Sequence, residues 1–148
     1  MREIKFRGRR KYKGEWIMGA LLTDNKTIYD ILYPEIQIDG KLKFRHFEVI
    51  PETVGQFTGF SDNNGIEIYE GDILEFITQR KYGFQYDGGK VRFKVEFGKF
   101  NPLNDTLYDF IGFHANGGSI QYKLHYGCVI IGNIHDNPEL INLNTEKK

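Results

Sequence analysis

Residues 64–77 read NGIEIYEGDILEFI, a pattern that predicts two short β-strands, each preceded by a turn. The first turn is Asn64-Gly65, a pair that readily takes the positive φ values that a tight hairpin requires. The second turn is Glu70-Gly71-Asp72, and it leads into residues 73–77, which alternate as a strand does. Since no stretch of the chain shows a sustained helical spacing of apolar residues, we predict a fold of short antiparallel strands.

The chain outside this stretch follows the same pattern. Residues 16–22 form a continuous apolar run, which predicts a strand covered on both faces. Residues 91–97 alternate apolar and charged side chains, which predicts a half-buried strand with one wet face. Residues 128–131 form a second apolar run. Twelve Phe and nine Tyr against only two Ala also favour strands over helices.

Turn signals separate these runs at short intervals, as in a barrel or sandwich. They are Asp39-Gly40, Asn64-Gly65, Asp87-Gly88-Gly89 and Asn116-Gly117-Gly118. One helical turn is expected near the C-terminus, where Asn137 can cap it and Pro138 suits its first position. We predict one all-β domain over residues 1–148 with at most short helices, and a flexible tail over residues 142–148.

Charge and cysteine content exclude several classes of protein. Lys plus Arg and Asp plus Glu are equal at 20 each, so no global field steers a nucleic acid or a membrane surface to the chain. Cys128 is the lone cysteine, which rules out a disulfide within one chain. The charged start of the chain has no apolar core of a secretory signal, and no apolar run is long enough to cross a bilayer. We expect a cytoplasmic protein without a membrane partner.

A local basic cluster lies at the N-terminus. Residues 1–13 hold seven Lys and Arg against one Glu, a net charge of +6. Clustered cations beside an aromatic ring can hold a phosphate backbone or a nucleotide. The candidate anion contacts are Arg7, Arg9, Arg10, Lys11 and Lys13. Because the whole chain is neutral, we favour the alternative that acidic neighbours in the fold balance these charges.

A second candidate contact site lies between two predicted strands, in residues 79–87. This Gly-containing loop combines cations with aromatic rings, which binding surfaces enrich. The candidate ligand-binding residues are Arg80, Lys81, Tyr82, Phe84 and Tyr86. Two interpretations stay open here, a contact patch or rings that tuck under the barrel.

No catalytic or metal-binding constellation is recognisable. The four histidines, at 46, 114, 125 and 135, are too widely spaced for a local metal motif. Residues 62–70 do not match an EF-hand loop, so a hairpin turn is preferred there over a calcium site. Cys128 has apolar neighbours, which raise the pKa of a thiol and make it inert. We predict no catalytic residue, no metal and no cofactor, and we do not expect an enzyme.

Three ordered segments resemble the YopX family of phage and prophage proteins. The central segment is residues 54–73. It resembles the central signature of the family, QYTGL-D-x-x-G-x-EIYEGDI. Residues 4–7 are similar to its N-terminal opening, and residues 131–140 to its C-terminal IGNIYENPEL. The chain departs from the family at Gly8-Arg9, where an aromatic usually follows the opening Arg.

The resemblance implies an SH3-like barrel core with additional N-terminal strands. On this basis residues 1–52 form the N-terminal β-rich part and residues 53–141 the barrel core that carries the motifs. The family has no agreed biochemical activity. The central motif itself indicates architecture, with Ile66 and Ile68 expected to point inward and Tyr69 opposite.

Three functions of different classes follow from these observations. The leading hypothesis is a non-enzymatic accessory protein that binds and blocks or sequesters a host component. That component is a host protein or a nucleotide-like small molecule, and under this hypothesis the protein acts in counter-defence. The alternative is a nucleic-acid-binding protein that acts through the basic N-terminus, and an unrecognised hydrolase ranks third. The 22 aromatic residues and exposed strand edges also lead us to expect a homo-oligomer.

Overall fold

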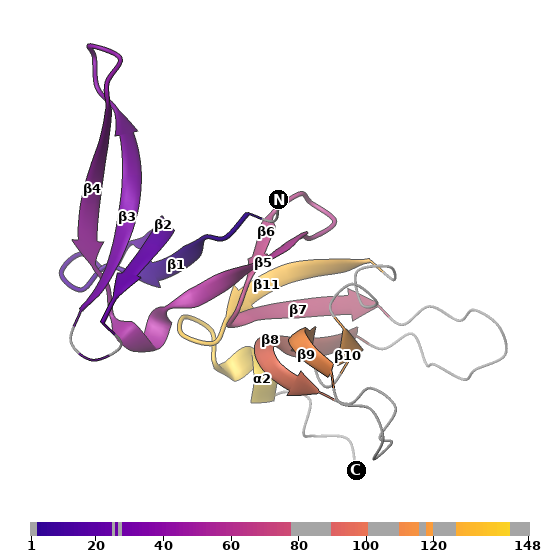
Figure 1. The fold of residues 1–148 in the computed structure, drawn as a ribbon. Coiled ribbons are helices and arrows are strands. Elements are labelled where there is room, and N and C mark those ends of the chain that lie inside the picture. The colour runs from indigo at the N-terminus through magenta and orange to yellow at the C-terminus, as the bar shows by residue number, and fades with distance from the viewer. Residues whose placement is uncertain are drawn as a thin grey trace, which may run out of the picture. The chain divides into compact units, whose positions relative to one another are not determined.

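The computed structural model describes residues 3–24, 26, 28–77, 90–100, 110–115, 118–119 and 127–142. Almost all of the regular structure is β (Figure 1). The first strands are β1 (Phe6–Arg9), β2 (Trp16–Thr23), β3 (Tyr29–Ile36), β4 (Leu42–Glu48), β5 (Gly55–Ser61) and β6 (Glu67–Tyr69). They are followed by β7 (Asp72–Ile77), β8 (Lys90–Phe100), β9 (Phe110–Ala115), β10 (Gly118–Ser119) and β11 (Cys128–Asn133). The helical segments are the 3-10 turn η1 (Pro51–Thr53) and α2 (Glu139–Asn142).

The chain divides into two compact units, residues 1–59 and residues 60–148. The predicted boundary between an N-terminal part and a core, at 52/53, lies a few residues before this division. That both parts form one domain stays a prediction. Residues 143–148, most of the predicted tail, lie outside the described residues.

The first unit contributes β4, β3, β2, β1 and most of β5 to a six-stranded antiparallel sheet with strand order β4-β3-β2-β1-β5-β6. Strand β2 changes partner halfway along. Residues 16–19 pair with β1, and residues 20–23 pair with β3. Gly19 stands at the change, where an added Cβ would lie 2.0 Å from the carbonyl oxygen of Leu32. Glycine is therefore required for this close approach of two backbones.

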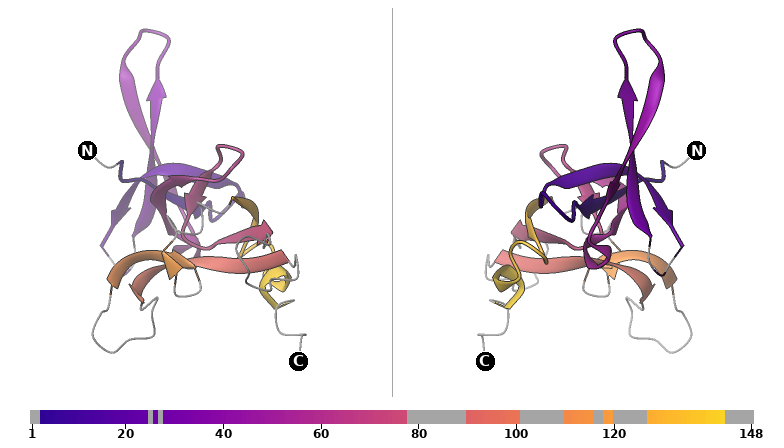
Figure 2. Two further views of the ribbon diagram at one scale, coloured as in Figure 1. Left: turned by 90° about the vertical axis from the view of Figure 1, so that its right-hand side faces the viewer. Right: turned by 90° about the vertical axis from the view of Figure 1, so that its left-hand side faces the viewer.

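Strands β3 and β4 form a long two-stranded hairpin, called the arm below. Figures 1 and 2 show it as a twisted ribbon that extends beyond β1 and β2. Its register runs from Asp30↔Glu48 to Ile36↔Leu42. At its base Ile31 is fully buried, and Val49, which follows β4, is buried too. These two side chains belong to the core of the first unit.

The second unit contains a five-stranded antiparallel sheet with strand order β10-β9-β8-β7-β11. Its core side chains come from strands that are far apart in sequence. They are Ile68, Leu74, Phe93, Val95, Phe113 and Cys128. Phe93 and Val95 lie two residues apart on β8, which confirms that this strand buries one face. Phe97 continues that face but is half exposed and packs edge-on against Phe113, with ring centroids 5.0 Å apart.

The turn between β5 and β6 is organised by the buried carboxylate of Asp62. Its Oδ1 accepts hydrogen bonds from the backbone N–H groups of Asn64 and Ile66, and its Oδ2 accepts one from Ile130 N at 3.0 Å. Gly65 has φ +79°, so the predicted Asn-Gly turn is confirmed. Since both carboxylate oxygens are bonded to N–H donors, Asp62 serves as a turn cap rather than as a calcium ligand.

The all-β class, the strands around residues 16–22, 73–77, 91–97 and 128–131, and the C-terminal helical turn are confirmed. Two details were wrong. Met18 and Leu22 are half exposed, so β2 is not covered on both faces. Ile66 is also exposed, because its backbone is held in the Asp62 turn. Within the described residues both sheets are open at their edges, and the SH3-like barrel stays a prediction.

Candidate binding surface of the N-terminal unit

The predicted anion contacts lie on β1 and on the turn that follows it. Arg7 and Arg9 belong to β1, and Arg10 forms an isolated bridge with Val49. The guanidinium carbon of Arg7 lies 4.9 Å from the centroid of the Trp16 ring. A guanidinium stacked on an aromatic ring in this way is oriented by a contact of about 0.5–1 kcal/mol at an exposed site.

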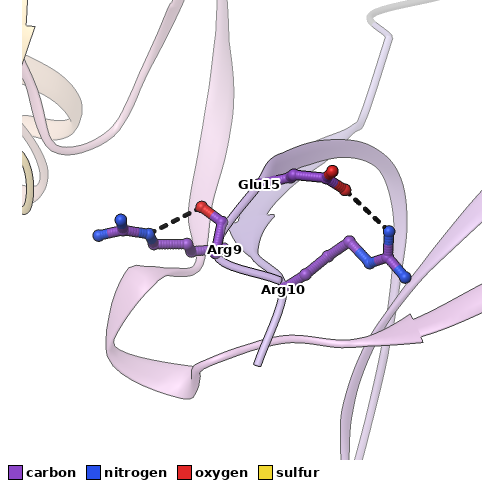
Figure 3. Close-up of polar contacts among 4 residues, drawn as sticks. Arg9, Arg10 and Glu15 are labelled. Carbon is purple, nitrogen blue, oxygen red and sulfur yellow. Dashed lines mark hydrogen bonds and ion pairs between the residues drawn. The ribbon is translucent and has the colours of Figure 1, made fainter. Parts of the chain in front are cut away.

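Arg9 holds the turn together. Its Nε donates to the carbonyl oxygen of Gly14 at 2.9 Å, and its backbone N–H donates to Thr53 Oγ1 at 2.9 Å. Gly14 takes a positive φ of +70° in this turn. Figure 3 shows the side chains of Arg9 and Arg10 leaving the chain on opposite sides. The two guanidinium groups therefore do not converge on one anion.

Arg10 is bound by an acid and by an aromatic ring. Its Nη1 donates to Glu15 Oε2 at 2.9 Å, as Figure 3 shows, and its guanidinium lies 4.2 Å from the ring centroid of Phe47. Arg45 also contacts the Phe47 ring, at 5.3 Å, and forms an ion pair with Glu35 at 3.6 Å. Each of the two cations around Phe47 therefore has its own carboxylate.

Lys11 forms an ion pair with Glu48. The hydrogen bond to the Glu48 carboxylate, and its negative charge, raise the pKa of Lys11. Lys13 is exposed and makes no ion pair with any residue in the described part of the chain. Of the five predicted anion contacts, four thus have contacts within the first unit. This arrangement favours the interpretation that acidic neighbours balance the N-terminal charge, and phosphate binding by these residues stays a prediction.

A small hollow lies beside this cluster. It has a volume of about 160 Å³. Its lining residues are Lys11, Tyr29, Glu48, Val49, Ile50 and Pro51. Pockets that hold cofactors or drug-sized ligands measure roughly 300–1,000 Å³. This hollow is too small to enclose a nucleotide.

The arm carries an apolar surface that the sequence analysis did not predict. Residues opposite each other in an antiparallel pair share a face of the sheet. Ile36 pairs with Leu42 and Pro34 pairs with Phe44, so these four side chains lie together and are called the arm face below. Ile36 is 77% exposed, and Leu42 and Phe44 are each 58% exposed. The missed signal was the short alternation of residues 42–45, LKFR, after the Asp39-Gly40 turn, which is typical of a strand.

The predicted ligand-binding residues of the loop 79–87 cannot be placed. Arg80, Lys81, Tyr82, Phe84 and Tyr86 lie outside the described residues.

The described histidines do not gather at one place. His46 is exposed and lies 3.0 Å from Asp30, whereas His114 and His135 are in the second unit. No group of three or more His, Cys, Asp and Glu that could hold a metal occurs in the described ranges. Cys128 is fully buried. In that same part of the chain, no helix has the length and apolar character needed to cross a bilayer.

The two β units described above define the class as a small all-β protein with an exposed arm. The chain belongs to the YopX family, whose profile, described as "YopX protein", matches residues 5–142. It is similar to the crystal structure of protein EF1440 from Enterococcus faecalis, with a TM-score of 0.58 and 22% sequence identity. The match covers 95% of this chain and 99% of that one, and it concerns the fold alone. No curated protein matches the chain.

The structure explains why the three family-like segments occur together. In the first unit, the opening segment pairs with the start of the central one: Phe6 lies opposite Gln56, and Phe57 N donates to Lys5 O. In the second unit, the central segment bonds to the C-terminal one. Ile134 N donates to the carbonyl oxygen of Gly71 at 2.9 Å. The segments therefore form the framework of each unit.

The departure at Gly8 also has a structural reason. Gly8 is buried in β1, and a Cβ at this position would lie 2.9–3.0 Å from the Val49 side chain. Glycine here lets Val49 pack directly against the backbone of β1. The bridge between Arg10 and Val49 follows two residues later.

Proposed function

We propose that this chain is a non-enzymatic accessory protein of a phage or prophage that binds a host protein and blocks or sequesters it. The observation that carries this proposal is the arm face, a cluster of exposed apolar side chains on a hairpin. Contiguous apolar side chains on a protein surface mark sites of contact with other proteins. The resemblance to phage and prophage proteins suggests that the protein acts in counter-defence, in the cytoplasm of the bacterial host.

A protein partner is favoured over a nucleotide by the shape of the described surface. The arm face lies on an extended hairpin, which suits a broad contact with a macromolecule. The hollow beside Lys11, in contrast, is smaller than the pockets that enclose compact ligands. The internal ion pairs of Arg10 and Lys11 also lower the charge available for a phosphate backbone.

The test is to immobilise the full chain and quantify the proteins retained from a bacterial host extract by mass spectrometry. We expect at least one host protein to be retained by the wild type and lost from the Phe44→Asp variant. The matched control is Ile28→Asp, because Ile28 is also exposed but lies outside the arm. The proposal is overturned if nothing is retained specifically. It is also overturned if denaturing the purified protein releases a stoichiometric nucleotide, seen by its ultraviolet and mass spectra.

A further inference from the structure

The outer edge of β4 is a row of backbone groups that the described sheet leaves open. β4 is the last strand in its sheet. Gln37 N donates to Lys41 O at 2.8 Å and Val49 N donates to Tyr29 O at 2.8 Å. Because bonded and non-bonded pairs alternate in an antiparallel ladder, the odd-numbered residues of β4 bond to β3. The even-numbered residues direct their N–H and C=O groups to the outer edge.

The open part of this edge is limited to three residues. The carbonyl oxygen of Glu48 accepts a hydrogen bond from Lys11 N at 3.1 Å, so the end of β4 is already covered. Leu42, Phe44 and His46 make no such backbone contact with another described segment. An open row of this length fits an extended segment of about five to seven residues, the usual length of a strand.

The other edge of the arm is closed to a new strand. The pairing of β2 with β3 ends at Ala20↔Leu32, so the rest of β3 has no neighbour on that side within the described sheet. Its first outward-facing position there is Pro34, which has no backbone N–H to donate. Proline is one means by which proteins protect an edge from pairing. The arm thus protects the edge of β3 and leaves that of β4 open.

The side chains of β4 specify the chemistry of an added strand. Leu42 and Phe44 belong to the arm face, whereas Lys43 and Arg45 point to the other face. Lys43 is exposed and forms no ion pair with a described residue. Arg45 is paired with Glu35 at 3.6 Å, but its side chain is 54% exposed, so it can accept a second carboxylate from an added strand. A strand beside β4 would therefore place apolar residues next to Leu42 and Phe44. It would place acidic residues next to Lys43 and Arg45.

A second copy of this chain is a poor occupant of the same edge. Two β4 strands related by a two-fold axis can pair in three registers through their outward-facing residues. If the two-fold axis passes at Phe44, Lys43 lies opposite the other copy's Arg45. If the axis passes at Lys43 or at Arg45, that residue lies opposite its own counterpart in the other copy. Like charges directly opposite each other destabilise a strand pair. A different, acidic strand avoids this repulsion.

We propose that β4 binds an extended segment of its partner protein by strand addition, and that this segment alternates apolar and acidic residues. The inference rests on the proposed function, and it adds the mode of binding and the chemistry of the target. The first unit supports it through its overall charge. Residues 1–59 hold eleven Lys and Arg against eight Asp and Glu, a net charge of +3, although the whole chain is neutral.

The probe is a fluorescently labelled, end-blocked peptide, Val-Glu-Val-Glu-Val-Glu-Val, and the control peptide has Lys at each Glu position. We expect the acidic peptide to bind about tenfold more tightly in a fluorescence anisotropy titration, because two cross-strand charge pairs change sign. Lys43→Glu should reduce that preference severalfold. Lys26→Glu makes the same change of charge at an exposed position outside the arm and should leave it unaltered.

Hydrogen exchange gives a readout that charge attraction alone does not produce. The acidic peptide should slow exchange at the amides of Leu42, Phe44 and His46. The amides of Lys43 and Arg45 are already bonded to β3 and should change little. Equal binding of both peptides overturns the inference, and so does binding without protection of the three amides. Protection that rises with protein concentration in the absence of peptide also overturns it, because a second copy would then occupy the edge.

The inference and the proposed function fail in different ways. If the wild type and Phe44→Asp retain the same host protein, the host-binding function stands and the assignment of β4 fails. If the acidic peptide adds to β4 but no host protein is retained, strand addition stands and the proposed function fails.

Discussion

Asp62 joins two strands that lie far apart in sequence. Its carboxylate accepts backbone N–H groups from the turn it caps and from Ile130 in β11. Burial by itself raises the pKa of this carboxyl group, but the hydrogen bonds from Ile130, Ile66 and Asn64 outweigh that effect. The pKa is therefore lowered from its ordinary value of 3.8.

A lowered pKa in the folded state makes the stability depend on pH. The Asp62 contribution is complete above the pKa of the unfolded chain and is lost as the pH falls through the lower pKa of the folded state. We expect Asp62→Asn to lower the free energy of unfolding by about 1.5–3 kcal/mol at pH 7, because its amide N–H₂ cannot accept a bond. Urea denaturation at several pH values should show this difference shrinking below about pH 4.

The control is Asp39→Asn, which alters an exposed turn carboxylate of the first unit. It should change the stability by no more than about 0.5 kcal/mol, as surface substitutions usually do. A pH-independent difference between wild type and Asp62→Asn would contradict the role of the charge.

Gly65 has a conformational role and no packing role. Its φ is +79°, and an added Cβ would meet no atom within 4 Å. We expect Gly65→Val to cost about 1–3 kcal/mol, since a β-branched residue is strained at positive φ. Gly65→Asn should recover most of that loss, because Asn tolerates the left-handed region. Thermal denaturation of the three proteins checks this, and equal melting temperatures for wild type and the Val variant would contradict it.

At the scale of elements, β2 depends on the partner change at Gly19. A methyl group there would collide with the carbonyl oxygen of Leu32, a backbone atom that cannot turn aside. We expect Gly19→Ala to separate β2 from β3 and to destabilise the protein by about 1–3 kcal/mol. Hydrogen exchange at residues 20–23 should accelerate. The neighbouring change Ala20→Gly adds no atoms and should leave that pairing in place.

The elements found from the sequence are those with strong local signals. The alternation in residues 91–97 and the apolar run in residues 128–131 identify strands because one or both of their faces are buried. β3 and β4 were not predicted because their local signal is weak: alternation is limited to residues 42–45, and the outer halves of both strands are mostly exposed and bury little. Their pairing, rather than burial, holds them as strands. The candidate binding surface was missed for the same reason.

At the scale of the molecule, the neutral net charge conceals an uneven distribution along the chain. The first unit is positive by three charges and the second is negative by three. If the N-terminal cations bound duplex DNA, affinity would fall steeply with salt, because each neutralised phosphate releases about 0.9 counterions. We expect no submicromolar binding to duplex DNA at physiological salt.

The suitable variant in that experiment is Lys11→Gln with Lys13→Gln. It removes two cations without breaking the contacts of Arg9 and Arg10 that support the turn. Electrophoretic mobility shift or anisotropy at several salt concentrations measures the affinity. Submicromolar binding that the double variant abolishes would favour the nucleic-acid hypothesis over a protein partner.

The sequence by itself determined the all-β class, the turn at Asn64-Gly65, the helical turn after Asn137 and the family. Each depends on neighbouring residues or on an ordered set of short motifs, so it can be read along the chain. Only the tertiary structure shows the partners of Arg10 and Lys11 and the exposure of the arm. Lys11 meets Glu48 and Arg10 meets Phe47 across about 37 positions of sequence. Such long-range contacts arise from strand pairing, which no local pattern specifies.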